Sequence, residues 1–197
     1  MFLCPPPPSN ENSMLYARDV ADDGYVSNFT RLWAWRPDVF DAFFSLRNLL
    51  TEQAKFSVRE RAILVCATAA NVGDSYCALA WGTKLASASN PETAAAVLQR
   101  EEAAELTLRE KALVVWAGQV VRAPNAITAE DVDRLRTAGL ADGEIFDATV
   151  LVAFRLAFST VNDALGACPD HQLAAAAPAA VRDAVAYGRS VSEHPSQ

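Results

Sequence analysis

Cysteine and histidine are scarce in this sequence, with four and two copies among 197 residues. The cysteines stand at positions 4, 66, 77 and 168 with no regular short spacing, and two histidines are too few for the usual Cys/His zinc site. We therefore predict no metal ion and no other cofactor. The same scarcity excludes a disulfide-stabilised scaffold, so we expect reduced thiols, as in the cytoplasm.

Clustered positive charge and long apolar runs are also missing. Lys and Arg number 17 against 24 Asp and Glu, a formal net charge of -7 without any basic block, which disfavours nucleic-acid binding. The longest apolar run, residues 145–158, is interrupted by Asp147 and Arg155 and falls short of the roughly 20 residues that a membrane-spanning helix needs. The N-terminus lacks the basic and apolar regions of a signal peptide. We expect a soluble, cytoplasmic protein.

Strand signals are absent, because no sustained two-residue alternation occurs and no Asn-Gly or Asp-Gly turn joins β-branched runs. Apolar residues instead recur at helical spacing over residues 38–53, and residues 142–165 form a long, largely apolar stretch that Gly166 ends. We therefore predict an all-α fold. It comprises a flexible Pro-rich leader over residues 1–13, a single domain over 14–190 and a C-terminal tail over 191–197.

An internal repeat is the most informative pattern in the chain. Residues 57–67, SVRERAILVCA, align without gaps to residues 107–117, TLREKALVVWA, at an offset of 50 residues. Each copy begins with a capping box, Ser57 with Glu60 and Thr107 with Glu110, and is then apolar almost all round. The pattern predicts two buried helices whose first-turn glutamates serve as caps rather than as catalytic groups.

A helix end, a short turn and a new helix are predicted between the two copies, over residues 71–82. Gly73 suits the turn and Asp74 suits an N-cap, which places Cys77 in the first turn of the second helix. The helix dipole lowers the pKa of a thiol there, whereas an ionised Asp74 one turn earlier raises it. Cys77 is therefore either a reactive thiol or a small apolar residue in a helix contact.

The chain resembles the alkylhydroperoxidase D / carboxymuconolactone decarboxylase superfamily, in its peroxidase-related branch. The resemblance rests on residues 57–86, with the S-x-R-E-R start and the Gly-x-x-Tyr-Cys turn, and continues through residues 107–170. It implies an all-α bundle that assembles into homo-oligomers, with the site at the turn before the Cys-bearing helix. In redox members a C-x-x-C pair, a His and a Glu make up that site.

The resemblance carries only part of the redox site over to this chain. Cys77 matches the second cysteine, which peroxide attacks, whereas Asp74 stands at the first cysteine, Trp81 at the histidine and Ala62 at the glutamate. Glu60 lies two residues off the glutamate register, about 200° away around a helix.

Three functions follow from this pattern. The leading one is hydroperoxide reduction through a single peroxidatic Cys77, recycled by an external thiol, because Cys66 on the preceding helix is too distant for a disulfide. The second is a lyase or isomerase that acts on a small organic acid through Asp74. The third is a non-catalytic oligomeric binder of a small apolar ligand near Trp81.

Other pocket candidates are Ser75, Tyr76, Trp81 and Glu60. No basic side chain can be placed in this pocket from the sequence, because His171 is expected on the surface after the long helix and His194 lies in the tail. A group of aromatic residues either packs in the core and between subunits or lines an apolar ligand pocket. Its members are Phe29, Trp33, Trp35, Phe40, Phe43 and Phe44.

Overall fold

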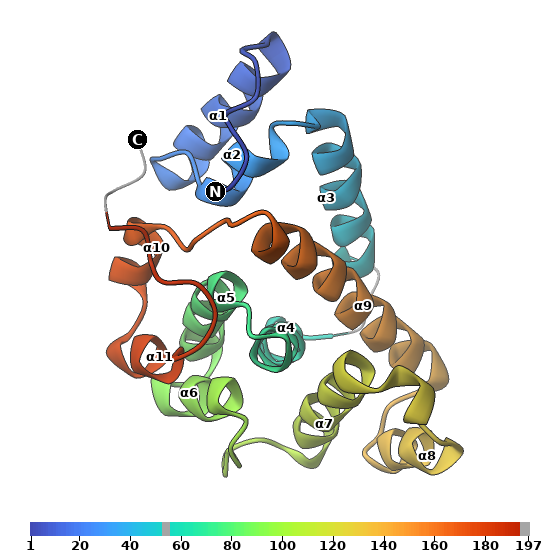
Figure 1. The fold of residues 1–197 in the computed structure, drawn as a ribbon. Helices are drawn as coiled ribbons and strands as arrows, with labels where there is room; N and C mark the ends of the chain where they lie inside the picture. Colours follow the sequence, from blue (N-terminus) through green and yellow to red (C-terminus); the bar gives the residue numbers. More distant parts are fainter. Residues whose placement is uncertain (53–55, 194–197) are drawn as a thin grey trace.

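Helix α4 (Val58–Val72) lies at the centre of the molecule, where Figure 1 shows it almost end-on. It packs against α5 (Ser75–Ala88), α6 (Pro91–Gln99), α7 (Leu108–Arg122) and α9 (Asp142–Ala164). Every residue of α4 from 62 to 70 is buried, because a helix surrounded by four others has no face left for water. The burial expected for the first copy of the repeat is confirmed.

The computed structural model describes residues 1–52 and 56–193, and for Thr51 and Glu52 it describes the backbone alone. Within these residues the chain forms eleven α-helices, one 3-10 helix and no strand, which confirms the all-α prediction. No helix in this part of the chain is long and apolar enough to cross a membrane. The remaining elements are α1 (Asn10–Asp23), α2 (Asn28–Trp33), α3 (Pro37–Glu52), η1 (Pro124–Ala126), α8 (Ala129–Thr137), α10 (His171–Ala176) and α11 (Ala179–Ala184).

The two longest helices follow the predicted ranges closely. Helix α3 covers residues 37–52, whereas the expected range is 38–53. Residue 53 lies outside the described residues. Helix α9 covers residues 142–164, and the left-handed backbone of Gly166, with φ of +80°, follows its end. Glycine adopts that conformation without the steric cost that a Cβ would bring.

The N-terminal leader differs from the prediction of an extended or mobile segment over residues 1–13. Helix α1 begins at Asn10, because the Ser9 hydroxyl accepts a hydrogen bond from the Asn12 N–H and so caps the first turn. The residues before it are also held, since the Phe2 N–H donates to the Leu165 carbonyl at 2.9 Å. Residues 10–13 therefore lie in the first turn of α1, which begins at a serine cap directly after the prolines.

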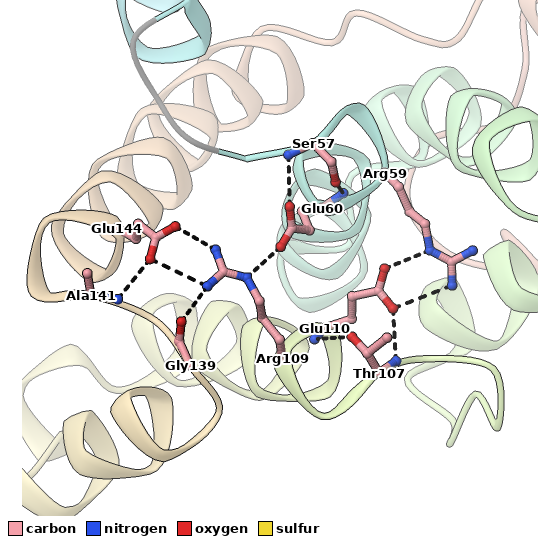
Figure 2. Close-up of polar contacts among 9 residues, drawn as sticks. All are labelled: Ser57, Arg59, Glu60, Thr107, Arg109, Glu110, Gly139, Ala141 and Glu144. Atoms are coloured by element: carbon pink, nitrogen blue, oxygen red, sulfur yellow. Dashed lines mark hydrogen bonds and ion pairs between the residues drawn. The ribbon is translucent and has the colours of Figure 1, made fainter.

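Both predicted capping boxes are present, and an ion pair joins each of them to the other copy of the repeat (Figure 2). Arg109 Nε lies 2.6 Å from Glu60 Oε1, and Arg59 Nε lies 2.7 Å from Glu110 Oε1. Since Arg59 and Arg109 occupy equivalent positions of the repeat, the two contacts are reciprocal. The glutamates therefore cap their own helices and bind α4 to α7 at the same time.

Arg109 extends this cluster to a third helix. Its Nη2 lies 2.8 Å from Glu144 Oε1, and the same carboxylate accepts a hydrogen bond from the Ala141 N–H at the start of α9. Its Nη1 donates to the Gly139 carbonyl at 2.8 Å. One guanidinium thus ties together the starts of α4, α7 and α9 (Figure 2).

We expect Arg109→Met to lower the free energy of unfolding by about 1–3 kcal/mol, because it leaves two partly buried carboxylates without their cation. Arg136→Met is the matched control, since Arg136 pairs with Asp133 and Asp142 on the surface. Its cost should stay below about 1 kcal/mol. Urea unfolding at neutral pH measures both values. Equal costs for the two variants would contradict the bridging role of Arg109.

The cluster should also make stability depend on pH. Partial burial works to raise the pKa of Glu60, but hydrogen bonds from Arg109 and Ser57 outweigh it and hold that pKa below its ordinary value. A depressed carboxylate pKa stabilises the fold above the pKa of the unfolded group, about 4.3, and this contribution is lost as the pH falls through the folded value. We expect a smaller loss of stability below about pH 4 in Arg109→Met than in the wild type, measured by urea unfolding across that range.

Candidate functional site

The turn between α4 and α5 has the predicted geometry. Gly73 adopts a left-handed backbone with φ of +86°, and the N–H groups of Gly73 and Asp74 both donate to the Ala69 carbonyl, at 2.8 and 3.0 Å. Asp74 is the N-cap of α5, because its Oδ1 accepts a hydrogen bond from the Cys77 N–H at 2.9 Å. The turn thus places the carboxylate and the thiol one helical turn apart on the same element.

Ser159 of α9 completes a buried trio with Asp74 and Cys77. Ser159 Oγ lies 2.5 Å from Asp74 Oδ2 and 3.9 Å from Cys77 Sγ. The exposed fractions of the three residues are 0% for Asp74, 1% for Ser159 and 4% for Cys77. Because the serine hydroxyl has one proton, it can stabilise the carboxylate or the sulfur, but not both at once.

Burial and the Asp74 carboxylate raise the pKa of the Cys77 thiol well above its ordinary value. The positive charge of Arg155 and the hydroxyl of Ser159 act in the opposite direction without reversing the shift. Burial is the largest cause of this shift, and the like-charge repulsion expected from Asp74 adds to it. The resting thiol is protonated at neutral pH.

Arg155 is a basic side chain near Asp74 and Cys77 that the sequence did not place there. It lies on α9, one turn before Ser159, and only 6% of its surface is exposed. Its guanidinium carbon lies 4.7 Å from the ring centroid of Trp81, and its Nε has no hydrogen-bond partner within the described part of the chain. The sequence does carry a signal for this placement, because Arg155 interrupts the apolar run over residues 145–158 and stands four residues before Ser159.

Ser75 and Tyr76 face other parts of the molecule instead of the thiol. Ser75 Oγ donates a hydrogen bond to the Arg189 carbonyl at 2.7 Å, and the Tyr76 hydroxyl bonds to the buried carboxylate of Asp170. Burial and then the Asp170 charge raise the pKa of Tyr76 well above its ordinary value. These side chains hold the segments after α9 and after α11 against the start of α5.

The C-terminal segment packs tightly over the turn that carries Asp74. A Cβ built on Gly188 would lie 2.5 Å from the Gly73 carbonyl oxygen and 2.8 Å from the Ser75 nitrogen, so only glycine fits there. Its φ of +75° favours glycine as well. A cavity of about 280 Å³ lies between this segment and α5, lined in part by Ser75, Leu79 and Arg182.

Glu60 and His171 lie apart from the trio. Glu60 caps the opposite end of α4, about 18 Å of helix from the turn that carries Asp74. His171 is exposed at the start of α10, and His194 lies outside the described residues. The four cysteines are free thiols, and Cys66 is fully buried in α4. Burial raises the pKa of Cys66 as well.

Most of the aromatic group packs around α9, in agreement with the alternative that placed these rings in the core. Trp33 stacks on Phe158 with 5.4 Å between ring centroids, and Phe43 stacks on Phe154 at 4.1 Å. Trp35 is separate, since 45% of it is exposed and its Nε1 donates to the Cys4 carbonyl. The remaining members, Phe29, Phe40 and Phe44, also contact one another. Within the described ranges, no group of three His, Cys, Asp or Glu residues is arranged to hold a metal ion.

Comparison with solved structures shows that the chain has the fold of the alkylhydroperoxidase D core. An uncharacterized peroxidase-related protein from Ralstonia eutropha JMP134 with that core matches with a TM-score of 0.78 at 24% identity, over 87% of this chain and 93% of its own. A second such protein, from Silicibacter sp. TM1040, matches with a TM-score of 0.79 at 22% identity over the same shares. The fold that the resemblance implied is confirmed.

A further structural neighbour is the debrominase Bmp8, whose Cys-to-Ala variant was solved in complex with 2,3,4-tribromopyrrole. It matches with a TM-score of 0.71 at 14% identity, over 89% of this chain and 95% of its own. No protein-family model and no curated protein sequence matches the chain. The fold is therefore shared by proteins described as peroxidase-related and by a debrominase, so the chemistry of this chain has to be argued from its own residues.

We expect Asp74→Asn to speed alkylation of Cys77 by iodoacetamide by about tenfold, the effect of a one-unit fall in thiol pKa. Asparagine keeps the N-cap and removes only the negative charge. The readout is mass spectrometry of the Cys77 peptide over time. Asp131→Asn is the matched control, because Asp131 caps α8 in a different part of the molecule and its loss should leave Cys77 unaffected. An unchanged rate in Asp74→Asn would contradict the assigned repulsion.

Proposed function

We propose that this protein reduces hydroperoxides through Cys77 as its single peroxidatic thiol. The observation that carries the proposal is the contact set of Asp74, Ser159 and Cys77, in which a nucleophile lies beside a buried carboxylate at a helix N-terminus. A thiol peroxidase needs a group that takes the thiol proton and returns it to the leaving oxygen. Asp74 is suited to both steps, and the fold neighbours described as peroxidase-related support the same class.

The first step transfers one oxygen atom to the thiol. Cys77 gives its proton to Asp74, and the thiolate attacks the terminal oxygen of the hydroperoxide as the O–O bond breaks. The leaving alkoxide takes the proton back from Asp74, which yields an alcohol and a sulfenic acid on Cys77. Ser159 stabilises the transient thiolate when its hydroxyl turns from the carboxylate to the sulfur, 3.9 Å away.

In this proposal an external thiol completes the cycle, because neither the position of the first cysteine nor the cysteine of the preceding helix offers Cys77 a disulfide partner. Asp74 occupies the position of the first cysteine, and Cys66 is enclosed in the core of α4. One small thiol condenses with the sulfenic acid, releasing water and leaving a mixed disulfide on Cys77. A second thiol attacks this disulfide, restores the Cys77 thiol and leaves as the oxidised small disulfide.

The second candidate is a lyase or isomerase on a small organic acid, with Asp74 as the proton-transfer group. Two observations favour it: the raised pKa of the Cys77 thiol, which reduces its nucleophilic form, and the charge of Arg155, which acts on both Asp74 and Cys77. Bmp8 was solved with a small halogenated pyrrole, so a small aromatic substrate is compatible with the fold. This reaction would not need the sulfur atom of Cys77.

Two variants separate the candidates. Under the peroxidase proposal, dimedone labels Cys77 after one equivalent of cumene hydroperoxide, and Cys77→Ser abolishes thiol-dependent peroxide consumption. Asp74→Asn should slow peroxide reduction about tenfold or more, because the leaving oxygen loses its proton donor, even though the same variant alkylates faster. A lyase would keep its turnover in Cys77→Ser and lose it in Asp74→Asn. Absence of the dimedone adduct on native protein would rule out the peroxidatic thiol.

Cys66→Ser is the matched control for this experiment. Cys66 is the other fully buried cysteine of the central helices, and it lies in the core of α4 away from Asp74 and Ser159. Its loss should leave both the dimedone adduct and the peroxide turnover within about twofold of the wild type. A large loss of turnover in Cys66→Ser would show that the sulfenic acid is resolved inside the chain, against the external thiol.

A further inference from the structure

Three cationic side chains from different helices gather at the Trp81 side of the buried trio. Arg155 of α9 lies with its guanidinium carbon 4.7 Å from the Trp81 ring centroid, and Lys84 of α5 has its Nζ 4.5 Å from the same centroid. Arg47 of α3 lies 4.3 Å from the ring centroid of Phe44. Each cation thus rests on an aromatic ring, which satisfies its charge only in part.

None of these three cations forms an ion pair with a carboxylate among the described side chains of residues 1–50 and 56–193. Arg47 donates to the amide oxygen of Asn48, at 3.0 and 3.3 Å. The buried Nε of Arg155 has no partner at all in this part of the chain. In a protein with a net charge of -7, three cations thus lie near one another without a direct ion pair.

The three charges also repel one another. Partial burial and then the charge of Arg155 lower the pKa of Arg47, and partial burial followed by Arg155 and Arg47 lowers the pKa of Lys84. Burying an arginine without a partner costs folding free energy, and placing two further cations nearby adds to that cost. The attraction between Arg155 and the buried carboxylate of Asp74 offsets part of this cost, and an anion bound among the three groups would offset more of it.

We infer that Arg155, with Lys84 and Arg47, binds the carboxylate of an aromatic substrate and holds it beside Cys77. A guanidinium offers Nε and Nη donors side by side, the geometry that pairs with both oxygens of a carboxylate. The half-buried rings of Trp81 and Phe44, on which these cations rest, offer aromatic surface for the body of the ligand. The identity of the substrate's reactive group rests on the peroxidase proposal. On that proposal, the substrate is a hydroperoxide that carries a carboxylate.

The inference differs from a purely electrostatic role of Arg155 toward the sulfur. The charge of Arg155 works to lower the pKa of the Cys77 thiol. If that were its role, removing Arg155 would slow the reaction of Cys77 with every hydroperoxide by the same factor. As a binding group, Arg155 would discriminate between an anionic substrate and its neutral ester. The two roles are therefore separable by a matched pair of substrates.

The binding test uses unreactive probes, para-isopropylbenzoate and para-isopropylbenzamide, titrated into the full chain by calorimetry. We expect the wild type to bind the carboxylate about tenfold or more tightly than the amide, as charged hydrogen bonds allow. Arg155→Met should abolish this preference and Arg155→Lys should keep part of it. The control Arg136→Met, on the surface of α8, should leave it unchanged. Equal affinity of the wild type for both probes would overturn the anion site.

A kinetic test uses para-carboxy-cumene hydroperoxide and its methyl ester. We expect Arg155→Met to lower kcat/KM for the acid by about tenfold more than for the ester, mainly through KM. Equal losses for acid and ester would leave Arg155 as a group that tunes the thiol and would contradict the inference. Because Arg155 is buried, the double variant Lys84→Met with Arg47→Met provides a second test at more exposed positions. We expect it to reduce the preference for the acid over the ester by less than Arg155→Met does.

The outcomes separate this inference from the proposed function. If the wild type and Cys77→Ser both prefer the benzoate probe but no hydroperoxide is consumed, the anion site stands and the peroxidase proposal fails. If hydroperoxides are consumed through Cys77 while acid and ester react equally and the probes bind equally, the peroxidase proposal stands and the anion site fails.

Discussion

The buried carboxylate of Asp74 is the interaction on which the site and much of its surroundings depend. One of its oxygens caps α5 through the Cys77 N–H, and the other accepts the Ser159 hydroxyl of α9. A fully buried carboxylate is tolerated because both oxygens have donors and the charge of Arg155 attracts it. The same carboxylate charge adds to the rise in the pKa of the Cys77 thiol, so Asp74 both organises this turn and lowers the thiolate fraction of Cys77.

Two segments from the C-terminal part of the chain close over this turn. Tyr76 bonds to Asp170 in the loop after α9, and Ser75 bonds to the segment after α11, which passes close enough to require glycine at position 188. The start of α5 is thereby held at two neighbouring residues. The exposed fraction of Cys77, in the same helical turn, is only 4%. Such a rigid, enclosed thiol favours selectivity for a particular substrate over general reactivity.

Local features were predictable from the sequence, and contacts between distant helices were not. The caps at Ser57, Thr107 and Asp74 depend on residues three positions apart, so the pattern determines them directly. The repeat showed that Arg59 and Arg109 are equivalent, but not that each would reach the glutamate of the other copy. That pairing depends on how α7 packs against α4.

The candidate site was likewise predicted in part. The sequence placed Asp74 and Cys77 together because a single turn joins them, and it missed Arg155 and Ser159 because these enter from a helix about 80 residues later. Their four-residue spacing marks one face of α9, yet only the packing shows which neighbour that face meets. Ser75 and Tyr76 were grouped with Cys77 as neighbours in sequence, whereas their side chains leave the helix in other directions.

The most direct measurement of the central claim is the intact mass of a variant that keeps Cys77 as its only cysteine, with Cys4, Cys66 and Cys168 changed to Ser. After one equivalent of a hydroperoxide, the account predicts a gain of one oxygen atom and its complete loss when an excess of a small thiol is added. A mass that does not change on native protein, while the unfolded chain is oxidised under the same conditions, would contradict the claim that Cys77 is a peroxidatic thiol.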